Sequence, residues 1–290
     1  MSFKGTTKVL TPETTTPGWV NFVVAHKGEA QPLIEHYGFK RCKEGAFTIY
    51  RSDDHTHLIL SGPGKIAAAS ATAYLFAILG EHRDMAWINF GCGGHRDMQV
   101  GEVCHAIKIS EHNSDRTWYP QSVLPHVAQA AELMTVDIAE KDFATTAVYE
   151  MEAAGYFALA SRLSSVELVH SLKVITDNRQ TPWGTPKQAA KTMHTLLAPC
   201  IALEQGLRQL SNEVTNRSNA NHELASTFFS TWHFTRTQQI QLGDLLRRFT
   251  HLCPETCAVN LTKDQRDAKG VLDQLTTATW HAAREFKLSS

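Results

Sequence analysis

The segment Tyr149-Glu150-Met151-Glu152-Ala153-Ala154-Gly155 says most about the fold of this chain. A strand-like stretch over 145–149 leads into it and a helical pattern over 151–163 leads out of it, so two carboxylates bracket a methionine where a strand meets a helix. Buried glutamates are rare unless they are paired or hydrogen-bonded, which favours a functional role. The alternative is a helix N-terminus whose dipole favours acidic residues. The Ala-Ala-Gly at the end of the segment indicates a helix whose backbone approaches the sheet closely.

On both sides of this segment, strand patterns alternate with helix patterns. Short apolar stretches rich in β-branched residues predict strands, and apolar residues at helical spacing predict helices. The predicted strands cover 19–25, 47–51, 57–60, 86–90, 102–109, 145–149 and 169–176, and the predicted helices cover 29–37, 66–79, 151–163 and about 185–210. Residues 110–126 are polar with interspersed aromatics and predict a long loop. This alternation is typical of an α/β protein with a central mixed, largely parallel sheet flanked by helices.

Two further carboxylates follow predicted strands. Asp177 ends the apolar stretch Lys173-Val174-Ile175-Thr176, and Glu29 lies in the first turn after the strand over 19–25. Open α/β sheets place their ligand sites at the carboxyl ends of the strands, so both positions suit a binding site. The alternatives are an ordinary turn aspartate and a solvated glutamate at a helix N-terminus.

Three other motifs fail the tests for cofactor or metal sites. Gly62-Pro63-Gly64-Lys65 lacks the spacing of a nucleotide-binding loop, and Ile66 stands where that loop needs Ser or Thr. Gly91-Cys92-Gly93-Gly94 lacks the spacing of a dinucleotide fingerprint, although small residues at a strand end let backbone amides approach a ligand. His251, Cys253 and Cys257 form an incomplete ligand set for zinc. We therefore expect neither a cofactor nor a metal.

The composition changes near Ser211. We expect an N-terminal segment over 1–18, an α/β domain over 19–211 and a C-terminal helical extension over 212–290. The polar run over 212–221 predicts a linker. Helical patterns beyond it cover about 221–231, 236–252 and 263–286, and the middle one has an apolar packing face.

The composition argues for a soluble globular protein. The 290 residues include 28 Lys and Arg against 29 Asp and Glu, so the near-zero net charge offers no general attraction to nucleic acid or to an anionic membrane. Six scattered cysteines are too few for a disulfide scaffold. The longest apolar stretch, 66–79, is too short to cross a bilayer, and no export signal is visible at the N-terminus. We expect a cytoplasmic protein.

Several short blocks occur in a recognisable order between about residues 19 and 180. They are Ala25-His26-Lys27-Gly28-Glu29-Ala30, Ser61-Gly62-Pro63-Gly64-Lys65 with the Ala-rich helix after it, Ile88-Asn89-Phe90-Gly91-Cys92-Gly93-Gly94 with Val100-Gly101-Glu102-Val103, Glu150-Met151-Glu152-Ala153, and Ile175-Thr176-Asp177. In this order they resemble the purine and uridine phosphorylase superfamily, and within it the methylthioadenosine/S-adenosylhomocysteine nucleosidase branch. The resemblance implies the phosphorylase/nucleosidase fold, with residues 213–290 as an extension that the nucleosidases lack.

The resemblance also implies roles in cleaving the N-ribosyl bond of a purine nucleoside or thionucleoside. Such cleavage passes through a cationic sugar, as in other glycoside hydrolyses. Asp177 would protonate the leaving base, and Glu29, helped by Glu150, would activate water. Glu152 would accept hydrogen bonds from the ribose hydroxyls while Met151 packs on the sugar. The remaining candidate substrate-binding residues are Cys92, Gly93 and an aromatic that stacks on the base, for which Phe143, Trp118 and Tyr119 are the candidates. The family further implies a homodimer or a higher homo-oligomer.

Three functions remain open at this point. Phosphorylases of the superfamily hold phosphate with an arginine and a hydroxyl residue where this chain has Asn89 and Cys92, which favours water as the nucleophile. A phosphate-dependent nucleoside phosphorylase is the first alternative. A non-catalytic nucleoside-binding or regulatory protein is the second, because the segment between Pro125 and Glu150 is short and Cys92 replaces a serine of the nucleosidases.

Overall fold

The computed structural model describes residues 18–42, 45–52 and 55–289, and these divide into two compact units with the boundary between Glu213 and Val214. The predicted N-terminal segment therefore lies almost wholly outside the described residues. Within the described residues, none of the helices is both long and apolar enough to span a membrane.

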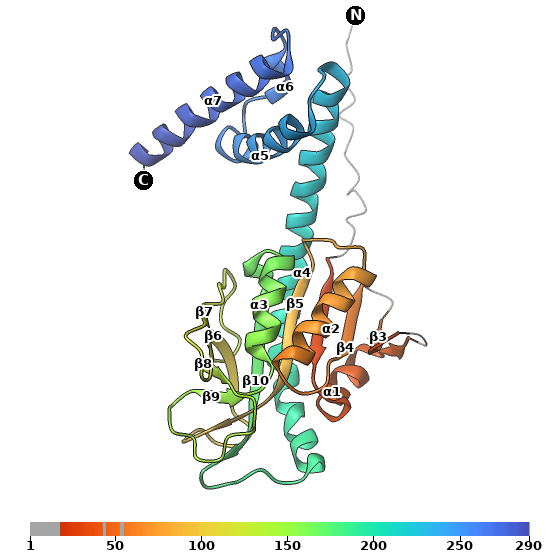
Figure 1. Ribbon diagram of the computed structural model, residues 1–290, viewed down its shortest axis with the longest axis vertical. Coiled ribbons are helices and arrows are strands. Elements are labelled where there is room, and N and C mark those ends of the chain that lie inside the picture. Colours follow the sequence, from red (N-terminus) through yellow and green to blue (C-terminus); the bar gives the residue numbers. More distant parts are fainter. Residues whose placement is uncertain (1–17, 43–44, 53–54, 290) are drawn as a thin grey trace, which may run out of the picture. The chain divides into compact units, whose positions relative to one another are not determined.

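In the first unit, the described strands form one mixed sheet of ten strands (Figure 1). The strands are β1 (Val20–Val24), β2 (Lys40–Arg41), β3 (Thr48–Arg51), β4 (Thr56–Leu60), β5 (Ala86–His95), β6 (Val103–Glu111), β7 (Thr117–Trp118), β8 (Gln129–Thr135), β9 (Val148–Glu150) and β10 (Val169–Asn178). The central pairings of β4 with β1, β1 with β5, and β5 with β10 are parallel. Strand β5 also pairs with β9, and β9, β8, β6 and β10 pair in turn, so these five strands close on themselves.

Helices cover both faces of this sheet. The helical segments are α1 (Lys27–Tyr37), α2 (Lys65–Ile78), α3 (Ala153–Leu163), the short 3₁₀ helix η1 (Val166–Leu168), α4 (Pro186–Thr231), α5 (Arg236–Leu252), α6 (Ala258–Thr262) and α7 (Ala268–Ser289). Apolar residues of α2 and α3 pack on one face of the sheet, and those of α1 and the first part of α4 pack on the other. This explains why β1 is apolar at nearly every position: Val23 faces one layer, whereas Phe22 and Val24 face the other. The predicted α/β class is confirmed.

Glycines allow two close approaches that shape the first unit. A Cβ on Gly155 would stand 1.9 Å from the Lys65 carbonyl oxygen, so the Ala-Ala-Gly segment lets α3 pack against the beginning of α2. Ala153 and Ala154 are buried in the core between α3 and the sheet, as predicted, whereas Gly155 faces α2. On β5, a Cβ on Gly93 would stand 2.5 Å from Val148 Cγ1, where the closed ring of strands crowds together. The glycine cluster consequently continues β5 to His95, whereas the prediction ended the strand at residue 90.

Three other predictions of local structure are wrong. The predicted linker over 212–221 lies inside α4, which has no Gly or Pro after Gly206 to stop the helix. Strand β7 lies in the predicted loop over 110–126, and β8 has no predicted counterpart. The last predicted helix, over 263–286, is divided between the end of a turn and α7, while α6 was missed.

The second unit, residues 214–290, has a hydrophobic core of its own. The end of α4, together with α5, α6 and α7, contributes the buried residues, among them Phe228, Leu246, Phe249 and Leu275. Helix α5 has the predicted bounds, and Thr235 and Gln238 form a capping box at its start. The predicted apolar face of α5 is confirmed in part: Leu242, Leu246 and Phe249 are buried, whereas Ile240 is exposed.

Candidate active site

A cavity of about 730 Å³ opens at the carboxyl ends of β1, β5 and β10 in the first unit. Residues from loops beside these strands, from the start of α1 and from the junction of β9 with α3 complete its wall. Apart from Trp118 and Tyr119, the candidate site residues named from the sequence line it: Glu29, Cys92, Gly93, Phe143, Glu150, Met151, Glu152 and Asp177. Side chains separated by more than a hundred positions in the sequence therefore face one space of the size that small-molecule sites usually have.

Glu29 combines the two roles considered for it. As the third residue of α1, it accepts a hydrogen bond at Oε2 from the His26 backbone N–H (3.0 Å), which closes a capping box. Its other oxygen, Oε1, accepts a longer bond from the Cys92 backbone N–H (3.4 Å). The helix cap thus holds the carboxylate in place at the wall of the cavity, where it can act on a nucleophile.

Glu150 is buried and its oxygens are fully occupied. Thr135 Oγ1 donates to Oε1, while Oε2 accepts from the backbone N–H groups of Glu152 (3.0 Å) and Ala153 (2.8 Å). Lys173 Nζ lies 2.9 Å from the same oxygen. Because these bonds fix the carboxylate at the start of α3 and against Lys173, the geometry favours a positioning role over the role of auxiliary base.

Glu152 follows Glu150 by two positions, at the start of α3, and lines the cavity. Its Oε1 accepts a hydrogen bond from the Gly64 backbone N–H (3.0 Å), and Oε2 lies 3.5 Å from Lys173 Nζ. Burial raises the pKa of Glu152 and nearby Glu150 adds to the rise, while Lys173 opposes it. Gly64 has a φ of 98°, a conformation that L side chains rarely adopt, so the glycine of the Gly-Pro-Gly-Lys turn serves to present its N–H to this carboxylate.

Lys173 is the site residue to which the sequence reasoning gave no role. The side chain is fully buried, and its ammonium lies between Glu150 and Glu152. Burial by itself lowers the pKa of Lys173, but the two carboxylates outweigh burial and raise it, with a smaller contribution from Glu29. Lys173 Nζ and Glu29 Oε1 lie 3.2 and 3.8 Å from the point where a Cβ on Gly91 would stand. The sequence signal for a buried, paired lysine was its position between Leu172 and the apolar pair Val174-Ile175.

These groups give one end of the cavity an excess of negative charge. Three carboxylates, Glu29, Glu150 and Glu152, surround a single ammonium group. In a low-dielectric site such an excess favours a positive charge on a bound molecule and disfavours an additional anion.

The opposite end of the cavity combines an acid with an aromatic ring. Asp177 is half-buried, and Thr176 Oγ1 donates to its Oδ1 (2.9 Å). Burial raises the pKa of Asp177, and the Thr176 hydroxyl opposes this. A Cβ on Gly94 would stand 2.6 Å from Phe143 Cε1 and 2.8 Å from Asp177 Oδ2, so the missing side chain lets the ring and the carboxyl group pack closely on the backbone of β5 and beside each other.

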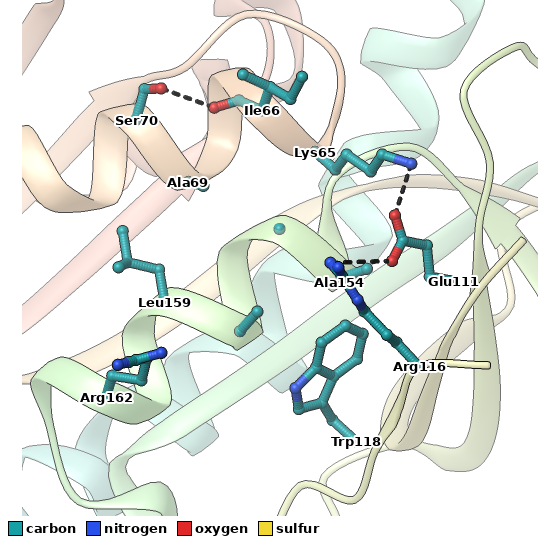
Figure 2. Close-up of a pocket in the computed structure, with 12 residues that line it drawn as sticks. Lys65, Ile66, Ala69, Ser70, Glu111, Arg116, Trp118, Ala154, Leu159 and Arg162 are labelled. Carbon is teal, nitrogen blue, oxygen red and sulfur yellow. Dashed lines mark hydrogen bonds and ion pairs between the residues drawn. The ribbon is translucent and has the colours of Figure 1, made fainter. Parts of the chain in front are cut away.

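Of the three candidate aromatics, Phe143 is the one that lines the cavity. It packs with Tyr149 and Met151 in a small cluster beside the site. Trp118 instead lines a second pocket between α2, α3 and the β6–β7 hairpin; Figure 2 shows it near Arg116, with Arg162 on α3 facing the same pocket. Tyr119 is largely exposed and lines neither pocket.

Cys92 and Asn89 both belong to β5, but only Cys92 of the two lines the cavity. The Cys92 thiol lies 3.4 Å from Met193 Sδ, and burial, reinforced by Glu29, raises its pKa, so it stays protonated at neutral pH. Asn89 is buried within the sheet, where its amide donates to the Val23 carbonyl (3.2 Å) and accepts from Ser171 Oγ (2.9 Å). Asn89 therefore joins β1, β5 and β10 and does not line the cavity.

Solved structures resemble this architecture. A mutant of the methylthioadenosine/S-adenosylhomocysteine nucleosidase of Helicobacter pylori, with 5′-methylthioadenosine in its active site, aligns with a TM-score of 0.56 and 13% identity over 65% of this chain and 99% of that chain. The apo 5′-methylthioadenosine nucleosidase of Arabidopsis thaliana aligns with a TM-score of 0.56 and 18% identity over 68% of this chain and 99% of that chain. The fold is that of the methylthioadenosine/S-adenosylhomocysteine nucleosidases.

The same nucleosidase fold is found in futalosine hydrolase of Helicobacter pylori, which aligns with a TM-score of 0.53 and 13% identity over 65% of this chain and 98% of that chain. No protein-family model matches the sequence, and no curated protein matches it either. About two thirds of this chain accounts for nearly all of each structural neighbour, so about one third of it has no counterpart there. At these identities the similarity establishes the nucleosidase fold, and the chemistry has to be argued from the cavity.

Proposed function

We propose that this protein hydrolyses the N-ribosyl bond of a purine nucleoside or thionucleoside of the methylthioadenosine/S-adenosylhomocysteine type. The observation that carries the proposal is the convergence of Glu29, Glu152 and Asp177 on one cavity. In the proposed reaction one of these carboxyl groups serves the nucleophile, one serves the sugar and one serves the base.

The proposed reaction uses a different property of each group. Asp177, whose pKa burial raises, donates a proton to a ring nitrogen of the leaving purine. As the C–N bond breaks, the ribose becomes oxocarbenium-like, and the excess negative charge around Lys173 stabilises it. Glu29 takes a proton from the attacking water, and Glu152 accepts hydrogen bonds from the ribose hydroxyls. The proton of Asp177 goes to the leaving base, and a proton of the attacking water goes to Glu29. Water and the nucleoside are thus converted to the free ribose derivative and the free base.

Water is a better nucleophile for this cavity than phosphate. Asn89, which by the resemblance corresponds to the phosphate-binding arginine of the phosphorylases, makes its hydrogen bonds within the sheet. Lys173, whose charge interacts with Glu29, already pairs with two carboxylates. An incoming dianion would meet an uncompensated negative charge there. This supports hydrolysis over phosphorolysis.

The decisive test offers the purified chain a panel of nucleosides. Adenosine, inosine, 5′-methylthioadenosine, S-adenosylhomocysteine and futalosine are each incubated with and without phosphate, and the free base is measured by chromatography. We expect base release from at least one of them in the absence of phosphate, and near-complete loss of it in Glu29→Gln and Asp177→Asn. Arg162→Met, in the second pocket, is the matched control and should remain active.

Other outcomes would select the other functions. Release that depends on phosphate would identify a phosphorylase. Binding of a nucleoside without release of its base would identify a non-catalytic binding or regulatory protein. We further propose that the chain acts as a homodimer or a higher homo-oligomer, which sedimentation analysis would test; a monomer at the concentrations of the assay would contradict it.

A further inference from the structure

The backbone at Phe143 adopts an unfavourable conformation. Its φ is 47°, in the left-handed region where a non-glycine residue other than Asn or Asp is uncommon. The ring is nevertheless almost completely buried, its edge packs on Gly94 beside Asp177, and it lines the same cavity as Asp177. Conformations of this kind persist only where surrounding contacts impose them.

Arg179 supplies such contacts. Its Nε and Nη2 donate to the Asp142 carbonyl oxygen (3.1 and 2.9 Å), and Nη2 also donates to the Phe143 carbonyl oxygen (3.3 Å). The guanidinium group thus holds two consecutive carbonyl groups, that of Asp142 before the strained residue and that of Phe143 itself. Arg179 itself follows Asp177 by two positions, directly after the end of β10.

The rest of the loop is anchored at both sides of this grip. On the earlier side, Glu140 Oε1 accepts from the backbone N–H groups of Lys141 and Asp142 (2.8 Å each). On the later side, the Thr145 N–H donates to the Tyr149 hydroxyl (3.0 Å). These anchors fix the ends of the turn, whereas Arg179 holds the peptide groups that set the direction of the Phe143 ring.

We infer that Arg179 is a positioning residue that holds the Phe143 ring against the base and sets its distance from Asp177. The inference rests on the proposed function, because it assigns Phe143 and Asp177 to one base. Arg179 and Asp177 both lie at the end of β10. The hydrogen bonds of Arg179 therefore fix the position of the Phe143 ring relative to the Asp177 carboxyl group.

The forked shape of the arginine side chain matters for this role. A guanidinium group presents several N–H donors in a fixed plane and can hold two carbonyls at once, whereas a lysine ammonium acts as a single compact charge. Without the grip, the turn relaxes from the left-handed conformation and the site is correctly formed only part of the time. The apparent affinity for the base then falls by the fraction of molecules that remain competent.

Four variants test this: Arg179→Met, Arg179→Lys, Phe143→Leu and the double variant of Arg179→Met with Phe143→Leu. The readouts are kcat and KM for the best substrate of the nucleoside panel, and the Kd of adenine by calorimetric titration. We expect Arg179→Met to raise KM and the adenine Kd about tenfold while kcat changes much less, and Arg179→Lys to recover part of the loss. In the Phe143→Leu background, Arg179→Met should have almost no further effect, because its target is gone.

The outcomes separate this inference from the proposed function. If the wild-type protein releases no base from any nucleoside, the proposed function fails, and the adenine titrations then decide the positioning role alone. An unchanged KM and adenine Kd in Arg179→Met overturns the inference, as does a protein that binds no adenine at all. The inference is also overturned if Arg179→Met weakens adenine binding equally in the wild-type and the Phe143→Leu backgrounds, because Arg179 would then act on the ligand directly or on the fold.

Discussion

Replacing Lys173 with methionine should destabilise the first unit strongly and in a pH-dependent manner. The substitution keeps the length of the side chain but removes the ammonium from between Glu150 and Glu152, which are 4% and 7% exposed. Removing one partner of a buried ion pair costs about 3–5 kcal/mol, because the remaining charge is left without compensation. For a unit of this size that corresponds to a fall in the melting temperature of roughly 6–20 °C.

The pH dependence follows from the carboxyl groups that lose their counter-ion. Lys173 opposes the rise that burial and Glu150 cause in the pKa of Glu152, so the variant should have a still higher Glu152 pKa. A carboxyl group whose pKa is higher in the folded than in the unfolded chain binds a proton more readily when folded, so its stability deficit is present above the unfolded pKa and shrinks as the pH falls. The deficit of the variant should therefore be largest at pH 8 and clearly smaller at pH 5.

Urea titrations of the wild type and the variant at both pH values provide the measurement. Adding Glu150→Gln to Lys173→Met should recover part of the stability at pH 8, because one of the two unpaired charges is then removed. Lys108→Met, which breaks the partly exposed pair with Glu132, is the matched control and should leave the midpoint nearly unchanged. A deficit of the same size at both pH values, or no larger than that of the control, would refute the electrostatic account of this cluster.

Three further predictions concern Asp177, Gly94 and a buried histidine pair. Asp177→Asn should lower kcat/KM by about 10²–10⁴, and the wild-type rate should fall as the pH rises through the raised pKa of Asp177; a flat pH–rate profile would contradict its role as the acid. Gly94→Ala should weaken adenine binding strongly in calorimetric titrations, because the new methyl group would stand 2.6 Å from Phe143 Cε1 and 2.8 Å from Asp177 Oδ2 and so displaces both side chains; an unchanged Kd would show that the base binds elsewhere. His105 and His170 are hydrogen-bonded to each other (3.0 Å), and burial lowers their pKa values to about 3 and about 4. Because their folded pKa values lie below the unfolded one, stability should fall as the pH drops below about 6.5, by up to about 1.4 kcal/mol per pH unit for each histidine; His105→Gln should reduce this slope in urea titrations, and an unaltered slope would count against it.

Local patterns in the sequence were sufficient for elements whose stability does not depend on distant neighbours. The apolar run of β1 and the bounds of α5 agree with the prediction, and the apolar face of α5 agrees with it in part. Strand β8 shows the opposite case, because its sequence Gln-Ala-Ala-Glu-Leu-Met-Thr consists largely of helix-forming residues. It is extended because it pairs with β6 on one side and β9 on the other, and no local pattern reports that. Likewise, nothing in the polar run over 212–221 is a strong helix breaker, and α4 simply continues through it.

For the site, the sequence by itself determined which carboxyl groups are available and that they follow strands. The order of short blocks also pointed to the nucleosidase fold. Only the tertiary structure decided how the work divides among them: Glu150 caps a helix, Glu152 faces the cavity, and Lys173 neutralises part of their charge. It also showed that Phe143 lines this cavity, whereas Trp118 lines another pocket. The physical reason is that these roles depend on burial and on hydrogen-bond partners far away in the chain, as between Gly64 and Glu152, and a linear sequence specifies neither until the strands have paired.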